Sequence, residues 1–200
     1  MNIRQLSDIH THTPGRSNAL LSVEPSQILP DISHSPFPIL HSPFSLSLHP
    51  WHLTPSSAGD FNRCIEHCKD NPMLMGIGEC GLDNHCDTQL ALQKEAFLLS
   101  LRTARQMHLP VIVHCVGYWA EMMECVREVW GASGANAALS DGVPIIIHGF
   151  RKGPDLTRQL LAAGFCISLG NRYNTASAEL IPADRLFRET DEDNNIIDTL

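Results

Sequence analysis

Two histidines stand one residue apart near the N-terminus, in the stretch Ser7–His12, which reads SDIHTH. Successive side chains of a strand point to opposite faces, so His10 and His12 are expected to project together at the end of a strand. Two imidazoles placed in this way suit the binding of one metal ion. A His-x-His pair also occurs by chance on surfaces, so the rest of the chain has to separate the two interpretations.

Other residues of types that can bind metals follow directly after short segments of apolar residues elsewhere in the chain. They are His49, Glu79, His114, His148 and Asp191. A single histidine in such a place is usually satisfied by a backbone carbonyl group. Here six apolar segments are each followed by a histidine or an acidic residue. This repetition favours one binding partner shared by all of them, because a buried imidazole or carboxylate without a partner is energetically costly. A divalent cation is a partner that all of them could share.

The types of these side chains limit the metal. A mixed set of histidines and carboxylates suits Zn, Mn, Fe or Ni, and also Mg where oxygen ligands are more numerous. Seven candidates are more than one tetrahedral shell can use. Two ions about 3.5–4 Å apart, with a carboxylate between them, would use the set and would activate a bridging water. We therefore expect two divalent metal ions as cofactors.

Short apolar segments are predicted to form the strands that position these side chains. The predicted strands are residues 6–8, 19–23, 44–48, 74–78, 111–113, 145–147, 165–169 and 185–187. Apolar residues at helical spacing predict four helices between them. The predicted helices are Asp60–Lys69, Leu90–Met107, Trp119–Val129 and Asp155–Ala163. Thr88 is the expected N-cap of the longest helix, and Gly164 is expected to end the last one.

Strands that alternate with helices predict parallel pairing and an α/β fold. Eight strands indicate a (β/α)8 TIM barrel, in which the carboxyl ends of all strands meet at one face. Such a barrel typically needs about 250 residues, so we expect one that is trimmed in the early helices and at the C-terminus. The early stretch Thr13–Ser47 is rich in Pro and Ser, and only nine residues follow Asp191. We interpret residues 1–200 as one domain.

The composition limits the partners of the protein. The formal net charge is −8, from 14 Lys and Arg against 22 Asp and Glu. This balance disfavours a stable complex along nucleic acid, which needs many phosphate contacts, but it permits an enzyme that touches a few phosphates. No apolar run reaches the roughly 18 residues that span a bilayer, and no signal peptide pattern begins the chain. A cytoplasmic location and no membrane partner are therefore expected.

The chain has seven cysteines, an odd number that does not suit a disulfide framework. Several of them lie in apolar surroundings, as reduced core thiols do. Cys64 and Cys68 are one helical turn apart and could share a metal, but no further thiol or histidine pair nearby completes a tetrahedral set. Both are expected to be packing residues.

The order of the motifs resembles that of the TatD-like metal-dependent hydrolases of the amidohydrolase superfamily. The motifs are HTH, LHPW, GIGECGLD, IVHC, IIHGF and RETD, and they extend from Ser7 to Asp191. GIGECGLD, followed by Gln93, Phe97 and LPVIVHC, is their most specific part. The resemblance implies a TIM-barrel hydrolase with divalent metal ions, from a family often described as deoxyribonucleases that act on phosphodiesters.

The resemblance also implies how two ions would divide the ligands. His10, His12 and Asp191 would bind one ion. The second ion would be bound by His114 and His148, with Glu79 bridging the two. Asp191 would in addition act as the general base on the attacking water. Glu192 and Asp193, which follow directly, are expected to be solvated and without a catalytic role.

The family positions that would contact substrate are matched only in part. His49 matches a family position that lines the site, and it is expected to contact substrate phosphate rather than metal. The family often has a basic residue shortly after the histidine of the fifth strand, where this chain has Cys115–Gly117, and an aromatic or basic residue where this chain has Asn84. These differences remove charge that would bind phosphate. The charge could be restored by residues after the sixth and seventh strands, namely Arg151, Lys152 and Arg172.

Three functions remain open from the sequence. The first is a two-metal hydrolase of phosphate esters, with a small phosphate ester or a DNA end as substrate. The second keeps the barrel and the metals but acts on a small amide, lactone or phosphomonoester, because the same His-x-His opening serves those reactions and a fold does not fix a function. The third is a barrel without catalysis, which would predict a missing ligand, and no ligand is missing.

Overall fold

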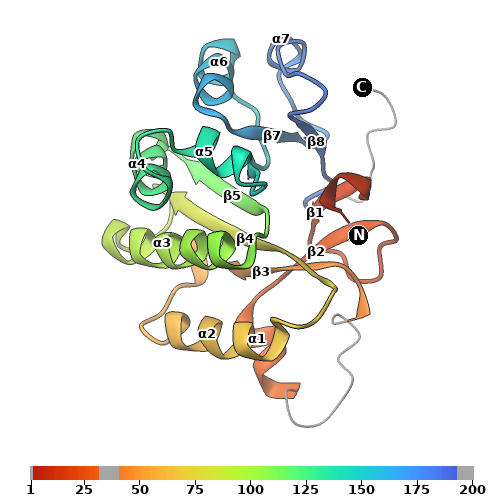
Figure 1. Cartoon of the computed structure of the whole chain (residues 1–200), viewed down its shortest axis with the longest axis vertical. Coiled ribbons are helices and arrows are strands. Elements are labelled where there is room, and N and C mark those ends of the chain that lie inside the picture. Colours follow the sequence, from red (N-terminus) through yellow and green to blue (C-terminus); the bar gives the residue numbers. More distant parts are fainter. Residues whose placement is uncertain (1, 32–40, 193–200) are drawn as a thin grey trace.

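The computed structural model describes residues 2–31 and 41–192 (Figure 1). Its eight strands form one parallel sheet in which every strand pairs with the next in chain order. The strands are β1 (Asp8–Thr11), β2 (Ala19–Val23), β3 (Phe44–Leu48), β4 (Leu74–Asp83), β5 (Val111–Val116), β6 (Ile145–Ile147), β7 (Cys166–Leu169) and β8 (Leu186–Arg188). The predicted α/β barrel is confirmed.

The first strand, β1, contacts the last strand, β8 (Figure 1). Residues from near the two ends of the sequence therefore lie side by side. Thr11 and Asp191 form a parallel bridge, in which the Asp191 amide donates to the His10 carbonyl at 2.9 Å. The buried Asp8 carboxylate accepts hydrogen bonds from the Thr190 amide at 3.1 Å and from the Thr190 hydroxyl at 2.7 Å. The barrel is therefore closed beside the His-x-His pair by a short set of polar contacts rather than by a long ladder.

The α-helices alternate with the strands. They are α1 (Pro25–Ile28), α2 (Ser57–Cys68), α3 (Leu90–Met107), α4 (Trp119–Trp130), α5 (Ala135–Ser140), α6 (Pro154–Ala163) and α7 (Thr175–Ala178), with 3-10 turns η1 (Ile3–Gln5), η2 (Leu29–Asp31) and η4 (Pro50–His52). Gly164 ends α6 in the left-handed conformation, as predicted. The predicted N-cap of α3 was wrong: Gln89 is the N-cap, and the Thr88 carbonyl accepts a hydrogen bond from the Gln93 side chain at 2.7 Å.

The helices cover the barrel unevenly. α2, α3 and α4 follow one another along the outer side of β3, β4 and β5 (Figure 1). Residues 12–18, between β1 and β2, contain no helix, and α1 has only four residues. This is the expected trimming of the early helices, although residues 32–40 of the Pro-rich stretch lie outside the described residues. None of the described helices combines the length and the apolar character that crossing a bilayer requires.

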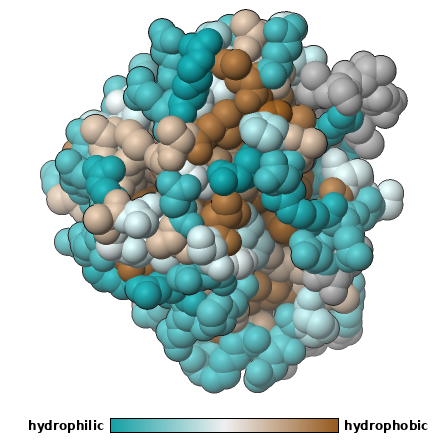
Figure 2. Space-filling model, turned by 45° about the horizontal axis from the view of Figure 1, so that its top comes forward, coloured by the Kyte–Doolittle hydropathy of each residue, from teal (hydrophilic) through white to brown (hydrophobic). Residues whose placement is uncertain are grey.

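Two apolar clusters fill the structure. The larger one lies between the sheet and the helices and includes Val111, Val113, Ile145 and Ile147. The smaller one includes Ile112 and Ile146, which point to the opposite face of the same strands. His114 and His148 stand two residues further on, so they share that inner face and lie just beyond the smaller cluster. Hydrophobic residues gather in a band on the face shown in Figure 2, between hydrophilic ones.

Six of the seven cysteines are buried within the two apolar clusters, and Cys86 is the exception. All seven are free, and Cys64 and Cys68 are buried on the side of α2 that packs against the larger cluster. Burial raises the pKa of Cys64 to about 12. A thiol that resists ionisation is a poor metal ligand, which agrees with the packing role predicted for this pair.

Candidate metal centre

Glu79 is positioned by a close approach of β4 to β5. A Cβ atom at Gly78 would lie 2.3 Å from the Ile112 carbonyl oxygen, and one at Gly81 would lie 1.9 Å from the His114 carbonyl oxygen. Both glycines also have positive φ angles, of +131° and +148°, a region that other residues rarely adopt. The glycines of GIGECGLD thus let β4 continue past Glu79 in contact with β5.

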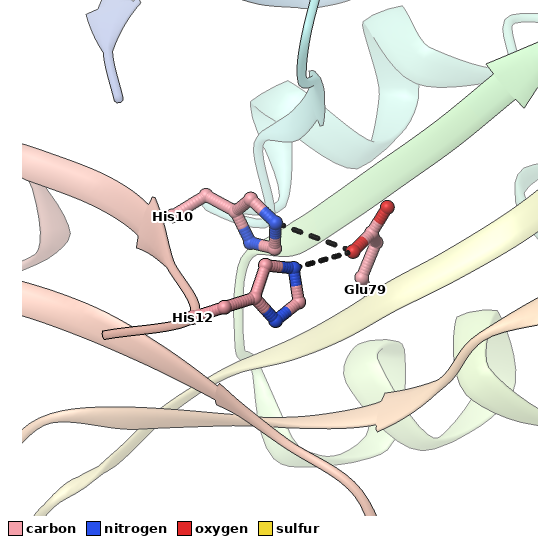
Figure 3. A group of neighbouring side chains, drawn as sticks. All are labelled: His10, His12 and Glu79. Carbon is pink, nitrogen blue, oxygen red and sulfur yellow. Dashed lines mark ion pairs between the residues drawn. The ribbon is translucent and has the colours of Figure 1, made fainter. Parts of the chain in front are cut away.

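One oxygen of the Glu79 carboxylate faces the His-x-His pair. Glu79 Oε2 is 3.2 Å from His10 Nε2 and 3.4 Å from His12 Nε2 (Figure 3). The two imidazoles reach the carboxylate from β1 and the residue beyond it, while Glu79 reaches them from β4. The expectation that His10 and His12 project together is therefore met, and their shared target is an acidic group from the other side of the barrel.

The other oxygen of Glu79 faces three further imidazoles. Glu79 Oε1 is 2.6 Å from His148 Nε2, 2.8 Å from His114 Nδ1 and 3.3 Å from His49 Nε2. Glu79 is only 3% exposed, and its two oxygens are divided between two groups of nitrogen atoms. This division is the central geometric feature of the site.

Asp191 approaches the first of these groups from the end of the barrel. Its Oδ1 is 3.7 Å from both His10 Nε2 and His12 Nε2, and its side chain is 29% exposed. The residue was expected to end the last strand, but β8 stops at Arg188 and Asp191 follows three residues later with a φ of +54°. Its backbone bridge to Thr11, rather than the β8 ladder, holds it at the site.

The charges of these groups support one another. Burial acts to raise the pKa of Glu79, but His148 and His10 outweigh it and hold that pKa well below the usual range. Burial acts to lower the pKa of His148, but Glu79 and Glu189 outweigh it and raise that pKa well above 6.5. The hydrogen bond to Glu79 is the largest cause that raises the pKa of His12. Glu79 is therefore an anion at neutral pH, surrounded by imidazoles.

His10 provides a test of whether the site fits a cation. Its side chain is fully buried, and neither of its ring nitrogens makes a hydrogen bond. An unsatisfied polar group at such depth is costly unless another partner is present. Three groups of ligand atoms within 4.8 Å of one another are found among the described residues. They are His10, His12 and Glu79; His10, His148 and Asp191; and His49, Glu79 and His114.

Two further buried carboxylates support the imidazoles and were missed by the sequence analysis. Asp83 Oδ2 lies 2.8 Å from His114 Nε2, and Glu189 Oε1 lies 3.7 Å from His148 Nδ1. Only Glu79 and Asp191 were predicted from the sequence as acids of the site, and Asp83 and Glu189 lie buried behind the histidines rather than along the cavity. Both missed residues stand inside quoted motifs, GLD and RETD, but no spacing rule separates a supporting carboxylate from a ligand.

The turn η4 fixes the ring of His49. His49 Nδ1 accepts a hydrogen bond from the Trp51 amide at 3.3 Å. A neutral imidazole that accepts at Nδ1 carries its proton on Nε2, and His49 Nε2 is the atom that faces Glu79. The same turn directs the Trp51 indole nitrogen to Asp83, to which it donates a hydrogen bond of 2.7 Å. His49 is thus arranged as a donor rather than as a lone-pair ligand.

A cavity of about 820 Å3 lies at the mouth of the barrel, and the buried His10, Asp83 and Glu189 are not among its lining residues. Arg151, Lys152 and Glu192 line it. Arg172, which was predicted to assist in binding substrate, is exposed and is not one of the lining residues. Asp193 lies outside the described residues. The cavity brings together His12, His49, Glu79, His114, His148 and Asp191 and leaves Arg172 apart.

A protein family matches most of the chain. The family model described as TatD related DNase matches residues 41–193. The metal-dependent hydrolase YabD of Bacillus subtilis, described as uncharacterized, is 29% identical over 135 residues, which cover 64% of this chain and 49% of YabD. A 3'-5' ssDNA/RNA exonuclease TatD of Pantoea vagans is 31% identical over 153 residues, which cover 72% of this chain and 55% of the relative. The matches thus span about half the length of these curated relatives.

Solved structures resemble the fold over a larger part of the chain. The crystal structure of YjjV, a TatD homolog from Escherichia coli, superposes with a TM-score of 0.70 at 17% identity and covers 94% of this chain and 79% of YjjV. A TatD family hydrolase from Entamoeba histolytica gives a TM-score of 0.66 at 16% identity, with 93% of this chain and 73% of the other covered. At these identities the similarity supports the barrel fold alone.

Proposed function

Because the chain belongs to the TatD related DNase family, we propose that it is a divalent-metal-dependent hydrolase that cleaves phosphate ester bonds with water. The observation that carries the proposal is the division of the Glu79 carboxylate. Its Oε2 faces His10 and His12, and its Oε1 faces His114 and His148. A carboxylate shared in this way suits a bridge between two cations.

The ligand set fits two such ions. His10, His12 and Asp191 would hold one ion, and His114 and His148 the other, with Glu79 between them. The fully buried His10 supports this assignment. Its ring nitrogens make no hydrogen bond, and its Nε2 lies 3.2 Å from the Glu79 carboxylate, where a cation would bind both groups. When bound, the ions would polarise a phosphoryl oxygen and lower the pKa of water toward neutrality.

Asp191 is the proposed general base. A base must reach the proton that it accepts, directly or through one water, and Asp191 combines a partly exposed side chain with a position 3.7 Å from two imidazole nitrogens. Glu79 is more deeply buried and is engaged by imidazoles on both oxygens. Asp191 is therefore the acidic group better able to meet water that enters from the cavity.

His49 is the proposed contact to the substrate phosphate. The Trp51 amide leaves its Nε2 protonated. This nitrogen lies 3.3 Å from Glu79 Oε1 at the wall of the cavity, and it would donate to a phosphoryl oxygen of a substrate bound there. Arg151 and Lys152 would add positive charge further out, because they line the same cavity. Arg172 would have to act from outside this cavity, so it is the weakest member of the proposed substrate-binding set.

A small phosphate ester or the end of a single nucleic acid strand fits these features. Arg151 and Lys152 provide all the arginine and lysine among the described lining residues, and the net charge of the chain is −8. Binding along many phosphates needs more positive charge than this. The name 3'-5' ssDNA/RNA exonuclease of the matched relatives supports the end of a strand as the substrate. The low positive charge equally favours a phosphomonoester as the second candidate.

Metal content and substrate preference test the proposal together. Protein purified without chelator is expected to contain up to two divalent ions per chain, and the double change His10→Ala and His12→Ala is expected to remove one. The metal-loaded protein should then be assayed on end-labelled single-stranded DNA, phosphomonoesters, carboxyl esters and amides. Full metal content in the double variant would contradict the metal site. Hydrolysis of only the esters and amides of carboxylic acids would contradict the proposed reaction.

A further inference from the structure

Trp51 is a large apolar side chain in an unusual place. It is 55% exposed, and among the described residues no other large hydrophobic side chain is exposed to that degree. It also lines the cavity that contains Glu79 and the histidines. Exposed indole surface is unfavourable in water, since apolar area is stabilised by burial. The metal ligands do not explain why this area lies open at the mouth of the site.

The indole is held by its edge. The turn η4 starts with His49 as its N-cap and Pro50 in its first position, and the Trp51 Nε1 group donates to Asp83 Oδ2 at 2.7 Å. The ring is edge-on to His49, with centroids 5.3 Å apart, and to His114, with centroids 6.3 Å apart. The polar edge is therefore satisfied on the protein while more than half of the residue surface remains accessible.

Trp119 shows what a structural tryptophan looks like in the same cavity. It is only partly exposed, packs against the larger apolar cluster and lies edge-on to Phe150 with centroids 6.3 Å apart. Packing therefore accounts for Trp119. Trp51 instead has a fixed edge and a large accessible surface.

We propose that Trp51 stacks on a planar ring of the substrate, namely the unpaired base next to the scissile phosphate ester. This inference rests on the proposed function, since it adds a base-binding subsite to the same cavity. Aromatic side chains bind unpaired bases by stacking, with little dependence on the sequence of the strand. Because the indole lies beside His49 and His114, which both contact Glu79, a base on Trp51 would be adjacent to a phosphate held at the metal centre.

A fluorescence experiment tests the contact without any turnover. The chain has three tryptophans, and the difference between the wild type and Trp51→Phe isolates the emission of Trp51. Thymidine 5'-monophosphate is expected to quench this component, and deoxyribose 5-phosphate, which lacks the base, is expected to leave it unchanged. Equal quenching by both compounds, or the same quenching in Trp51→Phe, would overturn the proposal.

A kinetic experiment uses Trp51→Phe and Trp51→Leu as a matched pair. Both variants lose the hydrogen bond to Asp83, so a difference between them reports on the ring alone. The substrates are a single strand with a normal terminal base and the same strand with an abasic terminal residue. We expect the wild type to prefer the normal strand by about tenfold in kcat/KM, within the range that base stacking gives. Trp51→Phe should keep most of the preference and Trp51→Leu should lose it, while the two variants act equally on the abasic strand.

The outcomes separate the stacking from the proposed function. If the wild type hydrolyses both strands and Trp51→Leu keeps the full preference for the normal base, stacking is wrong and phosphodiester hydrolysis stands. If the wild type hydrolyses neither strand, the proposed function fails on that substrate, and the fluorescence experiment still tests stacking by itself. Base-dependent quenching would then support Trp51 as a base-binding residue, and its absence would overturn the proposal.

Discussion

The two sides of the Glu79 carboxylate are built differently. On the side of β5 and β6, each imidazole has a second carboxylate behind it, because Asp83 contacts His114 and Glu189 lies near His148. On the side of β1, the ion pairs of His10 and His12 with other described residues are made by Nε2 and not by Nδ1, and the side chain of His12 is 43% exposed. We refer to these as the supported side and the unsupported side.

The difference means that the two proposed ions would have histidine ligands with different surroundings: one pair with further carboxylates behind it and one pair without. Carboxylates behind a metal-binding histidine fix its ring and increase its basicity, so the histidines of the supported side have acidic neighbours in addition to Glu79. The unsupported side depends on Glu79, on Asp191 and on the ion itself for its order. It is also the side that receives the proposed general base, so partial exposure there gives water access to Asp191.

The largest expected effect comes from Glu79, which belongs to both sides. Glu79→Ala should remove more metal than the loss of any single histidine, because both ions lose a ligand and the surrounding imidazoles lose their shared counter-charge. Glu79→Gln keeps the size of the side chain and removes its charge, so it separates charge from packing. Metal analysis and turnover measure both changes. Normal metal content and turnover in Glu79→Gln would mean that Glu79 is an ordinary acid of the strand.

The next largest effect is expected for Asp191. As both ligand and base, Asp191→Asn should reduce turnover by at least the 10²–10⁴-fold typical of the loss of a general base, with a smaller change in substrate affinity. Steady-state kinetics at saturating metal would separate the two constants. Near-normal turnover in this variant would show that another group accepts the proton.

A smaller effect is expected on the supported side alone. Asp83→Asn should weaken metal binding by about 10–100-fold, the usual range for a carboxylate that supports a ligating histidine. The matched control is Asp155→Asn, because Asp155 lies in α6 with its side chain 95% exposed and forms an ion pair with Arg158 on the same helix. Metal titration of both variants measures the difference. Equal affinities would mean that the second carboxylate has no influence, and the distinction between the sides would fail.

The pH dependence of metal binding should reflect both sides. The pKa values of His148 and His12 are raised in the metal-free protein, chiefly through Glu79, so these imidazoles keep their protons to higher pH than usual. A ligand must lose its proton to bind metal. Affinity should therefore rise as pH increases through the neutral range, by up to about tenfold per pH unit for each proton released. Calorimetry in buffers of different ionisation enthalpy would count the protons, and an affinity independent of pH would contradict this account.

The smallest effect is expected for Glu192. It is exposed and lines the cavity next to Asp191, but no ligand group of the described residues includes it. Glu192→Gln should therefore leave turnover and metal content nearly unchanged when both are measured beside Asp191→Asn. An inactive Glu192→Gln enzyme would show that the acid facing the unsupported side was assigned to the wrong residue.

Local patterns were sufficient for much of the fold. The helix Leu90–Met107 and the strands β2, β3 and β6 have the predicted bounds, because periodicity and apolar runs are local properties of the chain. The strand β4 was predicted to end at Gly78 but continues to Asp83. Beyond the predicted end, Gly81 pairs with His114. The role of Gly78 and Gly81 is to permit a close approach to β5, which no local pattern reveals.

The residues that could meet at the centre were evident from the order of the amino acids. An apolar run that ends in a histidine or an acid places that group at the carboxyl end of a strand, and parallel strands gather those ends at one face of a barrel. The partners of each group depend on the three-dimensional packing. Asp83 and Glu189 lie behind the histidines, Asp191 is held by a bridge to Thr11, and Trp51 stays exposed. These features depend on distances between segments far apart in the chain, which are set by the packing of the closed barrel.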